Sequence, residues 1–247
     1  MKSLVTLAAL SASALAGTTD DRIPDSAYVD YAANFAPFAA RITVRDAKGK
    51  ISKGTSTPIS DHWALTAGHV VEGGVSATIT SNANDFVSTD IVIHEQFDAD
   101  RLGYNDIALV RVSKPFGLKH YPPLGTERDT KPGDLVTLAG YGFHGPMSSG
   151  YTSTDGRLRA GTNRVERFER TVIICTAGGR SPLEFCISPG DSGGPMFTAG
   201  ADGRLVGIAS FTMADHPPLR SRRGEESAHT RVGLFREWIR KVTGGGE

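Results

Sequence analysis

The sequence lacks an excess of charge of either sign. Lys+Arg and Asp+Glu both number 27 in 247 residues, so the formal net charge is +0. A balanced chain has no global field that would attract nucleic acid or an anionic membrane surface, and we expect neither as a partner. The sequence also lacks any apolar stretch near the roughly 18 residues of a spanning helix, so no membrane-spanning segment is expected.

A shorter apolar segment stands at the N-terminus and has the features of an export signal. Lys2 supplies a positive start, Leu4–Leu10 is mostly apolar, and Ala14-Leu15-Ala16 has the small-x-small pattern of a cleavage site. We therefore expect residues 1–16 to be a signal peptide and the protein to be secreted, whether extracellular or periplasmic. The alternative is an ordinary N-terminal helix.

Cysteine is scarce: the sequence has two, Cys175 and Cys186, with ten residues between them. An even count in an exported protein favours a disulfide, which would here close a loop or a hairpin. The alternative is a pair of buried free thiols. No histidine lies near the pair at ligand spacing, so we expect no zinc site, and we expect no other metal or cofactor.

Glycine and proline are abundant instead, at 29 and 13 residues, which is typical of short strands joined by tight turns. Strand-like patterns recur from residue 38 onward, among them 40–44, 75–80, 107–112, 135–139 and 205–210. This spacing predicts an all-β sandwich or barrel. The one convincing helix is C-terminal, at about 234–242. Residues 17–34 are polar and irregular, and we interpret them as an N-terminal arm or a possible pro-segment.

The clearest chemical motif is Pro-Gly-Asp-Ser-Gly-Gly-Pro at 189–195. A serine hydroxyl is a poor nucleophile unless a base removes its proton, and acyl transfer also needs donors aimed at the developing oxyanion. Glycines beside Ser192 let the backbone turn sharply, so the N–H groups of Gly190 and Ser192 could converge as an oxyanion hole. The alternative is a glycine-rich turn between two strands.

A base and a carboxylate that could orient it precede this motif in the chain. His69 follows Trp-Ala-Leu-Thr-Ala-Gly at 63–68, where a small-residue turn after an apolar strand would present an imidazole well. Asp106 leads directly into the apolar run at 107–110. Each residue alone is more often structural, as a packed histidine or a turn aspartate. Together with Ser192 they stand in the order His, Asp, Ser, which predicts a catalytic triad.

This order and its surroundings resemble the chymotrypsin/trypsin family of serine proteases. The matching segments are Thr-Ala-Gly-His at 66–69, Asp-Ile-Ala-Leu at 106–109, Gly-Tyr-Gly at 140–142, Gly-Asp-Ser-Gly-Gly-Pro at 190–195 and Gly-Ile-Ala-Ser at 207–210. The resemblance implies an all-β fold of two antiparallel β-barrels with a C-terminal α-helix. The peptidase domain would span 35–247, with one barrel at about 35–120, the other at about 128–233, and a proline-rich linker at 113–132.

The resemblance also implies an activity, that of a secreted serine endopeptidase acting as a monomer on proteins or peptides. In that mechanism His69 takes the proton of Ser192, Asp106 orients and stabilises His69, and water hydrolyses an acyl-enzyme. One rival is a protease-fold binding protein without turnover. Another is a serine esterase on a different fold, which would need the order Ser, Asp, His and alternating strands and helices.

One departure from the family concerns Asp191, which the resemblance assigns as a structural carboxylate. Family members matured by cleavage begin near Ile-Val-Gly-Gly, and the freed amine pairs with the aspartate before the serine. No such segment exists here, and the only nearby basic–apolar junction is Arg22-Ile23, which Pro24 follows. The partner of Asp191 is therefore either the amine of Ile23 after a cut or another donor, and Pro24 favours the second.

The substrate pocket is the least determined part of the sequence. By resemblance, Ser210, Phe211 and Thr212 form one wall, and Ser227 lies near the rear. Thr212 stands where a glycine would keep the pocket open, so we expect a narrow pocket for small or medium apolar residues. His229 either packs near the pocket floor or favours an acidic side chain. The basic run at 220–223 is either a solvated loop tip or an exosite for an acidic partner.

Overall fold

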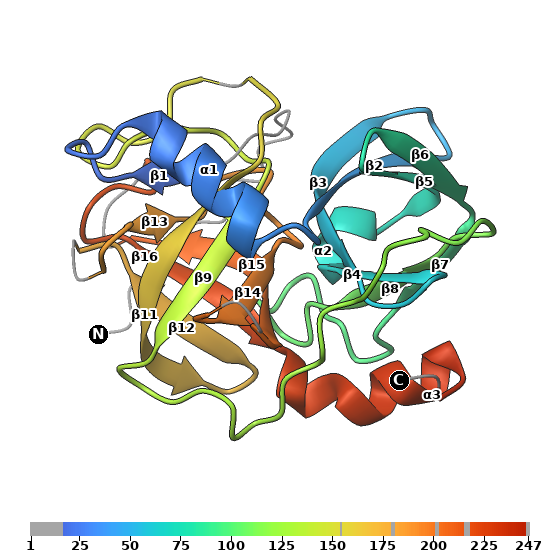
Figure 1. Ribbon diagram of the computed structural model, residues 1–247. Helices are drawn as coiled ribbons and strands as arrows, with labels where there is room; N and C mark the ends of the chain where they lie inside the picture. The colour runs from blue at the N-terminus through green and yellow to red at the C-terminus, as the bar shows by residue number, and fades with distance from the viewer. Residues whose placement is uncertain (1–16, 154, 179–180, 201–202, 215–217, 246–247) are drawn as a thin grey trace.

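The computed structural model describes residues 17–153, 155–178, 181–200, 203–214 and 218–245. Two β units lie side by side, with a helix at each end of the described chain (Figure 1). The fold is mostly β, with two antiparallel barrels and a C-terminal helix, as the sequence predicts. The expected signal peptide at 1–16 lies outside the described residues.

Seven antiparallel strands form the first unit, in the order β6-β5-β2-β3-β4-β8-β7. Alternation in sequence explains their burial: in β2 the side chains of Ala40, Ile42 and Val44 point inward while their neighbours are more exposed. The strands are β2 (Ala40–Asp46), β3 (Ile51–Pro58), β4 (Trp63–Thr66), β5 (Gly74–Ser81), β6 (Asn84–Ser88), β7 (Asp90–Ile93) and β8 (Ala108–Arg111).

Six antiparallel strands close the second barrel, in the order β11-β12-β16-β15-β14-β9. Its interior is packed with apolar side chains such as Leu138, Ile173 and Met196. The strands are β9 (Leu135–Gly140), β11 (Arg159–Glu169), β12 (Val172–Thr176), β14 (Pro195–Thr198), β15 (Leu205–Met213) and β16 (Glu226–Arg231). The proline-rich segment at 113–132 runs from β8 of the first unit to β9 of this barrel.

The C-terminal helix α3 (Arg236–Thr243) follows a 3-10 turn, η1 (Val232–Phe235), close to the predicted helix at 234–242. Gly244 ends α3 with φ +82°, a left-handed conformation that suits glycine. The His94 ring, which follows β7, lies 5.1 Å from the rings of both Phe235 and Trp238. The helix therefore leaves the second barrel and packs beneath the first (Figure 1).

The expectation that residues 17–34 are irregular is wrong. This stretch forms a short strand, β1 (Thr18–Thr19), and an eleven-residue helix, α1 (Asp25–Phe35), which lies over the second barrel (Figure 1). Only Tyr28 and Ala32 of α1 are buried, so the helix lacks the broad apolar face that a sequence pattern reveals. β1 lies between β10 (Gly145–Pro146) and β13 (Phe185–Cys186) in a three-stranded sheet.

The predicted disulfide is absent, because Cys175 and Cys186 are both free, buried thiols. Each cysteine packs in a different apolar cluster. Cys175 lies on β12 inside the second barrel, whereas Cys186 on β13 packs with Met147 and Ala177. Burial raises the pKa of both thiols, which keeps them protonated and chemically inert.

Candidate active site

Two paired strands bring His69 and Asp106 together. β4 and β8 are antiparallel, with Thr66 opposite Ala108, so the segment after β4 meets the segment before β8. His69 is presented there by the short helix α2 (Gly68–Val71). Its Nδ1 atom lies 2.8 Å from Oδ2 of Asp106, and its backbone N–H donates to Oδ1 at 2.9 Å.

The electrostatics of the pair favour an ionised carboxylate. Burial would raise the pKa of Asp106, but the charge of His69 and hydrogen bonds from His69 and Ser210 hold it below its ordinary value. Desolvation opposes protonation of His69, yet the charge and hydrogen bond of Asp106 raise its pKa above the ordinary value. Because an ionised carboxylate only accepts, Nδ1 carries the proton and Nε2 is left as an acceptor. The His69 side chain is 38% exposed, so a reactant can reach it.

Ser192 lies in the loop between β13 and β14, and this loop is fixed against the first unit. The Ser192 carbonyl accepts the backbone N–H of Thr55 on β3 at 2.8 Å. The next residue, Gly193, has φ +83°, and a Cβ there would lie 2.1 Å from both the Thr55 carbonyl and the Thr66 hydroxyl. Only glycine lets the loop approach so closely. The loop thus touches the end of β4, three positions before His69.

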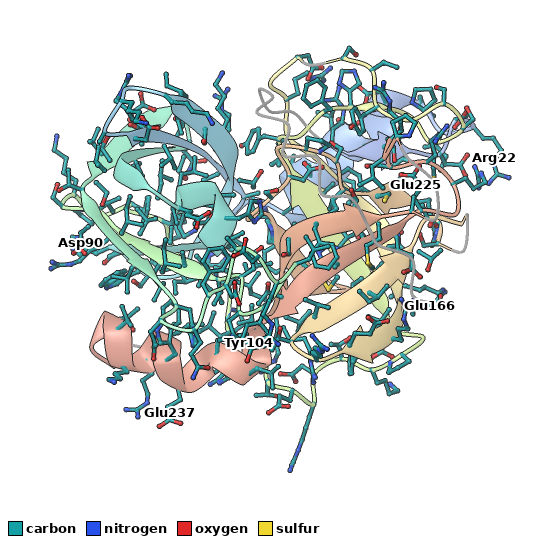
Figure 2. All side chains as sticks on the ribbon, turned by 180° about the vertical axis from the view of Figure 1, so that it is seen from behind. Arg22, Asp90, Tyr104, Glu166, Glu225 and Glu237 are labelled. Atoms are coloured by element: carbon teal, nitrogen blue, oxygen red, sulfur yellow. The ribbon has the colours of Figure 1, made fainter. Side chains whose placement is uncertain are left out.

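These contacts gather the three predicted triad residues at one junction between the two barrels. Among the described residues, no hydrogen bond joins the Ser192 hydroxyl to the His69 ring. Catalytic hydrogen bonds in free enzymes are often long and tighten only when substrate binds. Tyr104, in the loop that leads to Asp106, lies near the same junction (Figure 2).

The backbone beside Ser192 offers unused donors. Gly190 has φ +95°, a conformation that favours glycine, and its carbonyl accepts the Thr55 hydroxyl at 3.0 Å. In the described part of the chain, neither the Gly190 N–H nor the Ser192 N–H has an acceptor. Two free N–H groups next to a hydroxyl can bind an oxygen that becomes negative as the hydroxyl attacks.

The Asp191 carboxylate is enclosed by backbone donors. Its side chain is 0% exposed and accepts backbone N–H groups from Gly17, Gly142 and Ser188 at 2.8, 2.7 and 2.8 Å. A Cβ at Gly140 would lie 2.2 Å from its Oδ1 atom, so that position also requires glycine. Burial raises the pKa of Asp191 to about 7, although these hydrogen bonds lower it.

The donors to Asp191 are ones that sequence reasoning missed. Ile23 is not among them, because its N–H donates to the Asp20 carbonyl at 3.0 Å. The Gly-Tyr-Gly segment at 140–142 was the available signal for one donor, since two glycines flank the carboxylate. Gly17 gave no signal of its own, as it lies 174 residues from Asp191 in the chain.

The four predicted pocket residues fall on two neighbouring strands. Thr212 on β15 lies opposite Ser227 on β16, and Phe211 lies opposite Ala228. Phe211 packs across the loop before Asp106, where a Cβ at Gly103 would meet its ring at 2.3 Å. Ser210 does something else as well, because its hydroxyl donates to Oδ2 of Asp106. Sequence reasoning gave Ser210 a place in the pocket wall and missed this contact.

His229 is a packed, neutral histidine. It is fully buried, and burial lowers its pKa to about 3. Its Nε2 atom lies 3.2 Å from the Ser227 hydroxyl, which also contacts the Cys175 carbonyl at 3.4 Å. A neutral ring offers no charge for an acidic substrate side chain, so the packing interpretation is the better one.

The basic run at 220–223 is partly engaged within the fold. Arg222 pairs with Glu225 at 3.2 Å, and the Arg220 guanidinium lies 5.5 Å from the centre of the Tyr151 ring. Figure 2 shows Glu225 and Arg22 toward the same end of the second barrel. These contacts favour a structural loop over an exosite.

The described residues also bear on whether the chain holds a metal site or a membrane-spanning helix. No group of three or more His, Cys, Asp or Glu side chains there could hold a metal ion. In the same ranges, no helix has the length and apolarity needed to cross a membrane.

Comparison with known proteins gives consistent matches. A model of the Trypsin family matches residues 29–239. Serine protease SSP1 of Scolopendra subspinipes is 25% identical over 235 residues, which cover 85% of this chain and 80% of that protein. Brachyurin of Leptuca pugilator is 28% identical over 206 residues, with 75% and 85% covered.

Solved structures agree with the fold. HL collagenase superposes with a TM-score of 0.67 at 23% identity, covering 84% of this chain and 94% of that one. An inactivated protease paralogue of the scabies mite superposes with a TM-score of 0.65 at 18% identity, covering 86% and 96%. At these identities the superpositions show the fold, and the second shows that the fold occurs without activity.

Proposed function

The chain belongs to the trypsin family of serine proteases, and from that premise we propose that it is an active serine endopeptidase with Ser192 as nucleophile. The observation that carries the proposal is the His69–Asp106 pair, which is exposed at the imidazole and buried at the carboxylate. A buried carboxylate that fixes one ring nitrogen leaves the other free to take a proton at neutral pH.

The proposed cycle uses groups that lie at the junction between the barrels. His69 Nε2 removes the Ser192 proton as the hydroxyl attacks a peptide carbonyl, and Asp106 stabilises the imidazolium that forms. The N–H groups of Gly190 and Ser192 bind the oxyanion. His69 then protonates the leaving amine, and water repeats the cycle on the acyl-enzyme.

The finer features are also proposals. The family implies peptide substrates, and we propose secretion of a monomer after cleavage of the signal peptide at 1–16. Thr212 opposite buried Ser227 supports a narrow primary pocket, suited to small or medium apolar side chains.

One alternative function, a protease-fold binding protein, has support from a solved structure. One structural neighbour is an inactivated protease paralogue, so a protease-fold binding protein without turnover is the second candidate. Here His69, Asp106 and Ser192 are all present, and two of them are in hydrogen-bond contact. The esterase rival is not favoured, because the described part of the chain does not show the alternating strands and helices that it requires.

The decisive experiment is covalent labelling of Ser192. A fluorophosphonate probe should label the wild-type protein at Ser192, and profiling on a peptide library should show cleavage. Ser192→Ala should lose both while keeping its circular dichroism spectrum, because no other group can form the acyl bond. Ser88→Ala is the matched control, because it changes another buried serine, whose hydroxyl donates to the Asp90 carbonyl at 3.2 Å and contacts none of the three triad residues. A folded wild-type protein that neither labels nor cleaves would favour the binding protein.

A further inference from the structure

Asp191 is a buried carboxylate without a cation. Three backbone N–H groups bind it, and the described residues include no ion pair to it. The negative charge of Asp191 helps to raise the pKa of the Cys186 thiol, which is also buried. The Ser188 hydroxyl is a further donor, at 3.3 Å. A buried carboxylate that lacks a countercharge is costly to ionise, and neutral amides and a hydroxyl do not supply one.

Gly17 is held against this carboxylate by a dedicated strand. Its nitrogen lies 2.8 Å from Oδ2 of Asp191. The next two residues form β1, which pairs parallel with β10 and antiparallel with β13. The Thr19 carbonyl accepts the Met147 N–H at 2.8 Å, and the Thr18 hydroxyl donates to the Ser221 carbonyl. Within the N-terminal segment, β1 therefore brings the backbone nitrogen of residue 17 to Asp191.

Position 17 accepts only glycine. A Cβ at residue 17 would lie 2.1, 2.4 and 2.7 Å from three atoms of the Phe185 ring. The sequence places this glycine directly after Ala14-Leu15-Ala16, the small-x-small pattern of a leader cleavage site. Two independent features, the cleavage pattern in the sequence and the steric requirement for glycine at position 17, thus point to the Ala16–Gly17 bond.

We propose that hydrolysis of the Ala16–Gly17 bond by a leader peptidase during export is itself the activating cleavage of this protease. Water adds across the bond, leaving a carboxylate on Ala16 and an α-ammonium on Gly17. That ammonium replaces a neutral amide donor and pairs with Asp191. Removal of the leader and completion of the active site are then one event, with no separate pro-segment.

The structure also argues against a second cut at Arg22-Ile23. The Arg22 guanidinium pairs with Asp20 at 2.6 Å, and the Ile23 N–H donates to the Asp20 carbonyl at 3.0 Å. A cut there would detach β1, with Gly17 and its contact to Asp191. Because Asp191 lies between Gly190 and Ser192, the groups proposed to bind the oxyanion depend on how it is seated.

This inference rests on the proposed function, and its test separates the two. The full mature chain carries a removable N-terminal tag, cut so that Gly17 becomes the first residue. A control tag is cut so that Ala16 remains. kcat/KM on a peptide substrate and phosphonate labelling are measured on each sample before and after its cut. Carbamylation of the terminal amine by cyanate is mapped by mass spectrometry.

The Gly17 sample should gain about 100-fold in kcat/KM on cutting, since the competent state then becomes the populated one. Its α-amine should resist cyanate, whereas the Ala16 sample should remain weak and react. In the Gly17-first protein, Asp191→Asn should lose both the gain and the protection. Because each sample is compared with itself, a folding defect cannot imitate the result.

Two outcomes distinguish the hypotheses. Equal activity of both cut samples, with equal cyanate reactivity, would overturn the inference while leaving the endopeptidase proposal intact. A protected Gly17 amine in a protein that never cleaves or labels would support the cleavage-dependent ion pair and overturn the proposed activity.

Discussion

Three hydrogen bonds converge on the Asp106 carboxylate, two from His69 and one from Ser210. At the residue scale this arrangement decides how His69 titrates. The carboxylate is buried, so its charge acts on the imidazole with little screening by water. The pKa of His69 is accordingly above its ordinary value despite desolvation.

Activity should therefore rise with pH through the titration of His69. A raised pKa means that the ring keeps its proton to higher pH, so the inflection should lie on the alkaline side of an unperturbed histidine, at about 6.5. A kcat/KM profile from acid to alkaline pH measures it. A profile that is flat through neutral pH would contradict His69 as the base.

The Ser210 hydroxyl should act as a positioning group for Asp106. Ser210→Ala removes one hydrogen bond to a buried charged group, and we expect kcat/KM to fall roughly tenfold. The pH inflection should move as well, which a purely structural change would not cause. Ser88→Ala serves as the control, because that hydroxyl donates to the Asp90 carbonyl at 3.2 Å and makes no hydrogen bond to Asp106. An unchanged profile in Ser210→Ala would assign the residue to the pocket wall alone.

At the scale of elements, α1 is attached to the second barrel by a buried arginine. Arg159 on β11 is 0% exposed, and its guanidinium pairs with Asp25 at 2.5 Å and Asp155 at 2.7 Å. Both carboxylates are more exposed than the guanidinium, at 44% and 34%. The pKa of each lies below its ordinary value because of hydrogen bonds from Arg159. The cluster holds the first residue of α1 to β11, and the buried side chains of Tyr28 and Ala32 hold the rest of the helix.

Removing the two carboxylates should cost more stability than removing the Arg159 guanidinium. Asp25→Asn with Asp155→Asn leaves a buried guanidinium without a countercharge, which costs about 3–5 kcal/mol of unfolding free energy. Arg159→Met leaves two carboxylates that water can reach, so its cost should be smaller. Denaturant unfolding of both variants measures the difference. Equal losses would mean that the packing of residue 159, rather than charge, holds α1.

At the scale of the whole molecule, the N-terminal segment belongs to the second barrel rather than to the first, which it directly precedes. β1 brings the start of the described chain to Asp191, the residue before Ser192. The state of one terminal nitrogen can therefore affect the stability of the entire fold.

That dependence predicts a pH signature. When residue 17 carries an amide, burial raises the pKa of Asp191 to about 7 in the folded chain, whereas the ordinary value of 3.8 applies to the unfolded chain. Folding then favours the protonated carboxyl, so its contribution to stability is full below about 4 and is lost as pH rises through about 7. A free Gly17 ammonium should lower that pKa and remove the loss. The buried Cys186 thiol, the ionisable neighbour, stays neutral throughout this range.

Thermal unfolding between pH 4 and pH 8 measures this effect in the cut and uncut proteins. The uncut protein should lose stability across the range, and the Gly17-first protein should not. Asp191→Asn should flatten the profile of the uncut protein. The same slope in both forms would mean that the Gly17 amine does not reach the carboxylate.

The sequence by itself determined the mostly β architecture, the C-terminal helix and the order of His69, Asp106 and Ser192. These features depend on local patterns: alternating apolar residues, glycines beside a serine, and a histidine after a strand. The contact between His69 and Asp106 followed because β4 and β8 pair. Residue spacing can predict such features because they depend on residues that are close in the chain or that face each other across one pair of strands.

Only the tertiary structure decided the rest. The partner of Asp191 lies 174 residues away, and the hydroxyl of Ser210 reaches Asp106 across 104 residues. No local pattern encodes contacts at that separation. The helix α1 was missed because its two buried residues, Tyr28 and Ala32, form no apolar stripe, and because its ion pair reaches Arg159, 134 residues away. The two cysteines are free and pack in different apolar clusters. In each case the deciding energy comes from groups that meet only after the barrels have formed.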